Sequence, residues 1–172
     1  MRLTPLLLLS CLVPMSTAVF AAAPAPEIQR PVGTPQAIGA VHTLRAIPEA
    51  CARLEGVFTG EAATPYKYTA VRTDPQCQPR ARFVDYAKAQ PSEAKGWKLN
   101  DVIRVPAAAC PKQQAVVRVW RKPADNKPVL DGQGSARVYL EDAKKDAAAG
   151  KPLPAVTLYA AEMKVEGKGC AG

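Results

Sequence analysis

The chain has 172 residues, a formal net charge of +8 at pH 7 and an isoelectric point near 9.4. This length fits one domain of ordinary size, with enough residues to bury a hydrophobic core. The basic charge does not indicate nucleic-acid binding, because an aromatic content of 6% offers no obvious platform for base stacking.

Residues 1–21 have the order of a Sec-type signal peptide. A single cation, Arg2, precedes an apolar run, Leu6–Val13, and Pro14 then leads into alanine-rich sequence. Small side chains before the cut predict cleavage near Ala21. We therefore expect a periplasmic or secreted protein with no transmembrane segment in the mature chain.

Two alternatives to a cleaved signal peptide remain. An uncleaved anchor would need about 20 apolar residues, more than this hydrophobic run supplies. A lipoprotein is a minor alternative, because Leu8 and Ser10 precede Cys11 as in a lipobox. That alternative would require an apolar region shorter than the usual length of about 7 to 15 residues.

Residues 22–40 predict a flexible, proline-rich leader. Proline removes a backbone donor and fixes an extended conformation, so such a segment forms neither helix nor sheet readily. The segment contains Pro24, Pro26, Pro31 and Pro35. We interpret it as an idle leader rather than a tether that holds the domain away from a membrane or partner.

Residues 41–172 predict a β-rich domain. Short runs of valine, leucine and aromatic residues recur between turn-forming residues, with the alternation of half-buried strands. The predicted strands are Val41–Ala46, Ala52–Thr59, Lys67–Arg72, Ala81–Tyr86, Trp97–Val105, Ala115–Arg121, Ala136–Leu140 and Val156–Val165. One short helix is expected at about 141–149, where Gly150 follows as a stop signal. These elements predict a single small antiparallel β-sandwich or barrel.

Signal removal discards Cys11 and leaves an even number of cysteines, which in an exported chain favours disulfides. Four cysteines allow three pairings. A hairpin folded about Gly60–Tyr66 brings Cys51 opposite residue 76 or 77. The spacing therefore predicts Cys51–Cys77, which leaves Cys110–Cys170 as the second bridge.

No catalytic, cofactor or metal signature stands out. His42 has no second histidine with which to bind a metal ion. Ser135 follows a glycine-rich turn but lacks the GxSxG motif of a nucleophile elbow, and Ser92 has no such motif either. A hydrolase with a carboxylate pair would need two acids across a cleft, and no sequence feature singles out two of them. We expect no catalytic residues, cofactor or metal site, and no motif is specific enough to name a family.

Clustered cations are the remaining signal, and they predict a surface for an anion or a partner. This surface would comprise Arg80, Arg82, Arg118, Trp120, Arg121, Lys122 and Lys127. The sequence favours the other interpretation, a solvated face, since acids such as Asp85, Asp101 and Asp125 are interleaved with the cations.

Together these features predict an exported, non-enzymatic binding module of the bacterial envelope. Its partner would be a protein or an anionic envelope polymer. Two alternatives are an inhibitor or immunity-type protein that blocks an enzyme, and a hydrolase using a carboxylate pair. The sequence specifies neither the ligand nor the oligomeric state.

Overall fold

The computed structural model describes residues 23–124, 132–133, 145, 148–149 and 156–170. In this part of the chain two β-sheets pack face to face, which confirms the predicted sandwich, and they do not close into a barrel. The predicted signal peptide 1–21, the predicted strand Ala136–Leu140 and most of the predicted helix 141–149 lie outside the described residues. No helix in the described ranges is long and apolar enough to cross a membrane.

The smaller sheet has three antiparallel strands in the order β1-β2-β3. These strands are β1 (His42–Ile47), β2 (Ala52–Phe58) and β3 (Tyr66–Arg72). Their bounds agree with the predicted strands to within about one residue at each end. Strand β2 alternates strictly between buried and half-buried positions, so its apolar side chains form one face. A 3₁₀ turn, η1 (Pro48–Ala50), joins β1 to β2.

The larger sheet has the strand order β4-β7-β6-β5. Its strands are β4 (Ala81–Phe83), β5 (Lys98–Ala107), β6 (Cys110–Lys122) and β7 (Thr157–Glu166). The three long strands are antiparallel, as predicted, whereas β4 pairs with β7 in parallel. The larger sheet is therefore mixed. Strand β4 runs in the same direction as β7, whereas β7, β6 and β5 alternate in direction.

Strand β4 is shorter than the predicted strand Ala81–Tyr86. The amide of Val84 still donates to the carbonyl of Tyr159 at 2.8 Å. Asp85 then begins the helix α1 (Tyr86–Ala89), and its Oδ1 accepts a hydrogen bond from the Ala87 amide at 3.0 Å. Asp85 thereby caps the helix, because it binds a backbone amide that has no partner within the first helical turn. The change from extended to helical backbone at this residue ends the strand.

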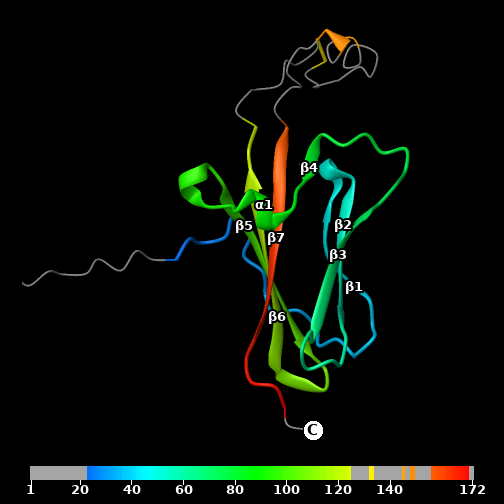
Figure 1. Ribbon diagram of the computed structural model, residues 1–172, viewed down its shortest axis with the longest axis vertical. Coiled ribbons are helices and arrows are strands. Elements are labelled where there is room, and N and C mark those ends of the chain that lie inside the picture. The colour runs from blue at the N-terminus through cyan, green and yellow to red at the C-terminus, as the bar shows by residue number, and fades with distance from the viewer. Residues whose placement is uncertain (1–22, 125–131, 134–144, 146–147, 150–155, 171–172) are drawn as a thin grey trace, which may run out of the picture.

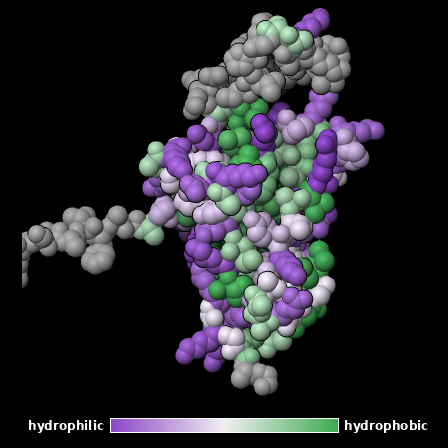
Figure 2. Space-filling view, viewed as in Figure 1, coloured by the Kyte–Doolittle hydropathy of each residue, from purple (hydrophilic) through white to green (hydrophobic). Residues whose placement is uncertain are grey.

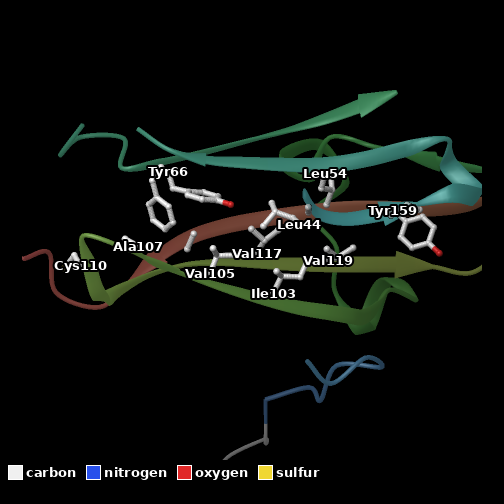
Figure 3. Close-up of a cluster of buried hydrophobic side chains, with 14 of the residues drawn as sticks. Leu44, Leu54, Tyr66, Ile103, Val105, Ala107, Cys110, Val117, Val119 and Tyr159 are labelled. Atoms are coloured by element: carbon white, nitrogen blue, oxygen red, sulfur yellow. The ribbon is translucent and has the colours of Figure 1, made fainter. Parts of the chain in front are cut away.

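The hydrophobic core lies between the two sheets (Figure 3). Aliphatic and aromatic side chains from both sheets interdigitate there, as expected of a sandwich core about 10 Å thick. The residues drawn from the smaller sheet include Leu44, Leu54 and Tyr66, and those from the larger sheet include Ile103, Val105, Val117, Val119 and Tyr159.

Both predicted disulfides are present. The Cα–Cα distance is 5.9 Å for Cys51–Cys77 and 5.6 Å for Cys110–Cys170. The hairpin places Thr73 opposite Cys51, since the Thr73 amide donates to the Cys51 carbonyl at 2.9 Å. A turn then brings Cys77 back, with its amide donating to the Asp74 carbonyl at 3.2 Å. The predicted hairpin therefore pairs the correct cysteines. The residue opposite Cys51 is Thr73, however, and not residue 76 or 77 as expected.

The segment 22–40, expected as a flexible leader, instead lies along the edge of β5. Amides of Glu27, Ile28, Gly33 and Gln36 donate to carbonyls of β5 at 2.8 to 2.9 Å. The prolines do not prevent this docking, because the residues between them keep their backbone N–H groups. These groups donate to carbonyl oxygens on the unpaired edge of β5. We call residues 27–39 the N-terminal edge segment; it ends with the Gly39 amide donating to Phe58 on the smaller sheet.

Candidate functional site

The structure separates most of the predicted cationic surface. The guanidinium of Arg118 forms an ion pair with Glu166 at 3.0 Å. Arg121 pairs with Glu27 of the N-terminal edge segment at 2.6 Å, and this hydrogen bond raises the pKa of Arg121. Neither arginine is therefore available as an uncompensated positive charge.

Two further members of the predicted surface, Arg80 and Trp120, do not join a shared site. Arg80 is exposed, and its backbone amide donates to the Glu49 carbonyl at 2.6 Å. The indole Nε1 of Trp120 is buried without a hydrogen-bond partner among the described residues. Lys127 lies outside the described residues. Arg82 and Lys122 remain, and the fold brings these two together.

The connection between β4 and β5 crosses the outer face of the larger sheet. Residues 84–97 have to span this face, because β4 and β5 form its opposite edges. The crossing connection contains α1 and the 3₁₀ turn η2 (Glu93–Lys95), and α1 contacts β7 (Figure 1). It ends at Trp97, a buried side chain, immediately before β5 begins.

A row of three side chains lies on the outer face of the same sheet. Register pairs Arg82 of β4 with Leu158 of β7, and Leu158 with Lys122 of β6. Residues that are directly paired project from the same face of a sheet. Their chain neighbours Phe83 and Tyr159 project inward and belong to, or pack against, the core. Two cations thus flank a leucine on the face away from the core.

A groove lies between this row and the crossing connection. It has a volume of about 800 Å³ and is open to solvent. Its cations come from both sides, namely Arg82 and Lys122 from the sheet and Lys88 and Lys95 from the connection. Its apolar lining is Phe83, Val84, Ala89, Trp97 and Leu158. In Figure 2 hydrophilic side chains gather over the part of this face that carries α1, beside hydrophobic surface.

The groove cations have no acidic partners in the described part of the chain. No ion pair joins Arg82, Lys88, Lys95 or Lys122 to a described carboxylate. Asp85 is the one acid in the lining, and its Oδ1 is occupied in capping α1. The groove therefore concentrates positive potential in a concave surface, which attracts anions.

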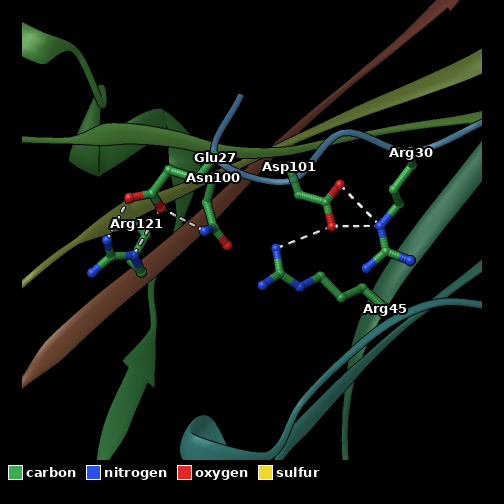
Figure 4. Close-up of polar contacts among 6 residues, drawn as sticks. All are labelled: Glu27, Arg30, Arg45, Asn100, Asp101 and Arg121. Atoms are coloured by element: carbon green, nitrogen blue, oxygen red, sulfur yellow. Dashed lines mark hydrogen bonds and ion pairs between the residues drawn. The ribbon is translucent and has the colours of Figure 1, made fainter. Parts of the chain in front are cut away.

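A second polar cluster connects the N-terminal edge segment to both sheets (Figure 4). Asp101 of β5 is fully buried, with Arg30 of the segment at 2.9 Å and Arg45 of β1 at 3.2 Å. The Arg45 guanidinium also lies 5.9 Å from the ring centroid of Tyr159, within cation–π range. Burial lowers the pKa of Arg45, and the Asp101 carboxylate opposes this shift.

Glu27 completes this connection at the start of the segment. It accepts hydrogen bonds from Asn100 at 2.6 Å and from Arg121 at 2.6 and 3.0 Å (Figure 4). Each charged side chain of this cluster therefore has a partner of opposite charge, and the Asp101 carboxylate contacts two arginines. We therefore interpret the cluster as structural. Its signal in the sequence was the polar pair Asn100–Asp101 inside the apolar run Trp97–Val105.

The residues considered for catalysis have structural roles where they are described. His42 Nδ1 lies 3.0 Å from the Ala40 carbonyl, and Nε2 lies 2.8 Å from the Tyr66 hydroxyl. The Ser92 carbonyl accepts hydrogen bonds from the amides of Lys95 and Trp97, and Ser135 lies outside the described residues. Within the described ranges no group of three or more histidine, cysteine or acidic residues could hold a metal ion.

The cationic groove is thus a concave surface of the described part of the chain on which four cations gather without an ion pair. Comparison of the chain with protein-family models, with curated proteins and with solved structures finds no match.

Proposed function

We propose that this chain is an exported, non-enzymatic binding module of the bacterial envelope whose cationic groove binds an anionic envelope polymer. One observation carries the proposal: four cations converge on a solvent-open groove, and no described carboxylate neutralises any of them. By contrast, several arginines outside the groove form ion pairs. Arg30, Arg45, Arg118 and Arg121 all contact a carboxylate within 3.2 Å.

The shape of the groove favours a polymer over a small molecule. An enclosed site buries most of a small ligand, whereas this groove is open to solvent. A polymer can lie in an open groove and present several acidic groups to cations on both sides. Each contact is weak and screened by salt, so affinity would come from the sum of contacts.

The chemistry of the lining supports binding over hydrolysis. A glycosidase needs two carboxyl groups that flank the bond to be cleaved. The groove lining contains one carboxylate, Asp85, which caps α1. Asp101, the fully buried acid, lies outside the groove and is held between Arg30 and Arg45.

Two disulfides are consistent with an oxidising compartment outside the cytoplasm. The proposed export also depends on the sequence pattern of residues 1–21. Release from cells by osmotic shock, together with an N-terminal sequence beginning near Ala22, would support this part of the proposal.

The groove is tested by salt elution from a heparin-type resin. The test variant carries Arg82→Gln, Lys88→Gln, Lys95→Gln and Lys122→Gln. The control carries Lys67→Gln, Lys112→Gln, Lys164→Gln and Lys168→Gln, which removes the same charge from exposed positions outside the groove. We expect the groove variant to elute at much lower salt than the control. Equal elution of the two variants would overturn the proposal, because net charge alone would then explain retention.

A further inference from the structure

We infer that the groove holds a linear acidic glycan lying across the strands of the larger sheet, with two anion subsites near its ends. This inference rests on the proposed function and specifies its ligand. The groove follows the row Arg82, Leu158, Lys122, which runs perpendicular to the strands. A ligand that follows the groove therefore crosses from β4 towards β6.

The first subsite lies at the β4 end. Arg82 is the middle residue of β4 and projects from the outer face. The chain then passes through Val84, which still bonds to β7, and turns into α1 with Lys88 on it. Arg82 and Lys88 thus approach the same end of the groove from the sheet and from the crossing connection.

The second subsite lies at the β6 end. Lys122 is the last residue of β6, and its Cε lies 3.7 Å from the position that a Cβ on Gly96 would occupy. Gly96 directly follows Lys95, the last residue of η2. Lys95 and Lys122 thus form a second cation pair, again with one member from each side of the groove.

The two subsites are separated by two strand spacings. Strand β7 lies between β4 and β6, and neighbouring strands are about 4.8 Å apart, so the Cα atoms of Arg82 and Lys122 are about 10 Å apart. Arginine and lysine side chains are long enough to converge on one anion across this distance, but extended side chains on either side of Leu158 present two separate anion positions. A chain with regularly spaced acids can contact both pairs while extended.

The floor between the subsites favours a glycan over other polyanions. Half-buried aliphatic groups of Leu158, Val84 and Ala89 line it, and such groups pack against the apolar faces of sugar rings. A single-stranded nucleic acid would need exposed aromatic rings for stacking, but Trp97 is only 5% exposed. Among the residues that the structure describes, the exposed large aliphatic ones that could enter a lipid layer are Val32, Ile38 and Val41, which lie outside the groove.

A length series of α-1,4-linked oligogalacturonides tests the two-subsite arrangement, because each sugar carries one carboxylate. Binding of the full mature chain to the monomer, dimer, tetramer and hexamer is measured by calorimetry at low salt. We expect at least a tenfold gain in affinity between the dimer and the hexamer. Two half-groove variants are compared, R82Q/K88Q and K95Q/K122Q. Each should lower the affinity for the hexamer to near that of the dimer while leaving the affinity for the dimer within about threefold.

The outcomes separate this inference from the proposed function. If the dimer binds as tightly as the hexamer and binding is lost in the four-fold groove variant, the two-subsite arrangement is wrong and the groove proposal stands. If single-stranded DNA or anionic lipid vesicles bind at the groove and the glycans do not, the assignment of a glycan is wrong. If no anion shows binding that depends on the groove cations, both proposals fail. Thermal melting of each variant confirms that it is folded.

Discussion

At the scale of single residues, Gly56 permits an aromatic contact that crosses three strands. His42 on β1 pairs with Gly56 on β2, and Tyr66 on β3 extends its ring over this glycine. The Tyr66 hydroxyl thereby reaches His42 Nε2 at 2.8 Å. Because Nδ1 donates to the Ala40 carbonyl, Nε2 accepts from the phenol in the neutral ring. Burial raises the pKa of Tyr66, which keeps the phenol protonated as the donor.

Replacing Gly56 with alanine should therefore destabilise the domain. An ideal Cβ on Gly56 would lie 1.8 Å from the Tyr66 hydroxyl oxygen and 2.5 Å from Cζ. Overpacking of this kind costs about 1 to 3 kcal/mol, and the displaced phenol also loses its bond to His42. Urea denaturation of Gly56→Ala should show this loss. The control is Gly132→Ala, since a Cβ at Gly132 meets nothing within 4 Å. Equal stability of the two variants would contradict the packing described for Tyr66.

Asp101 is the second residue whose replacement should be severe. Asp101→Asn preserves the shape but leaves the largely buried Arg45, and the more exposed Arg30, without a neutralising charge. Breaking a buried ion pair by removing one partner costs about 3 to 5 kcal/mol. The free energy of unfolding from urea titration should fall by an amount of this order. Glu61→Gln, in an exposed pair with Lys67, should produce no comparable loss, and a large effect there would show that charge alone is responsible.

At the scale of elements, docking of the N-terminal edge segment should depend on pH through Glu27. The hydrogen bond from Arg121 lowers the pKa of Glu27 in the folded protein. A lowered folded pKa stabilises the fold above the unfolded value of about 4.3, and this contribution disappears as pH falls through the folded pKa. Glu27→Gln should therefore be less stable than the wild type at pH 7, and the difference should be smaller at about pH 3 than at pH 7. A constant difference between the two proteins at both pH values would show that Glu27 does not act through its charge.

The two disulfides constrain loops of different length and should contribute differently to stability. They join cysteines separated by 26 and 60 positions in the chain. The loop-entropy relation gives about 3.5 kcal/mol for Cys51–Cys77 and about 4.3 kcal/mol for Cys110–Cys170. Variants with both cysteines of one pair changed to alanine should differ in this order in urea denaturation. A larger loss on removing the shorter loop would mean that native-state contacts, not loop entropy, decide the contribution.

Strands and turns could be predicted from the sequence where the alternation of neighbouring residues determines them. Alternation in the predicted run Ala52–Thr59 and the hairpin after it located two strands and one disulfide pair. The N-terminal edge segment was not predictable from its prolines. Its docking depends on free carbonyls along β5 and on Asp101, which lies 71 positions from its partner Arg30.

At the scale of the whole molecule, the groove depends on strand order, which the sequence pattern does not reveal. Positions 82, 88, 95 and 122 meet because β4 and β5 form opposite edges of one sheet, and the connection between them crosses its face. The prediction included Arg118 and Arg121 because they lie next to Lys122 in the chain. Their acidic partners, Glu166 and Glu27, lie 48 and 94 positions away, which is why local charge counting missed the pairing.

Mapping the bound polyanion on the protein tests the central claim most directly. Backbone amide chemical shifts of the mature chain are followed during titration with the oligogalacturonide hexamer. We expect the largest chemical-shift changes at Arg82, within residues 84–97 and at Lys122. The changes along the N-terminal edge segment should be small. Shifts concentrated instead around Arg118 or the exposed Val32, with residues 84–97 unchanged, would contradict the assignment of the groove as the binding site.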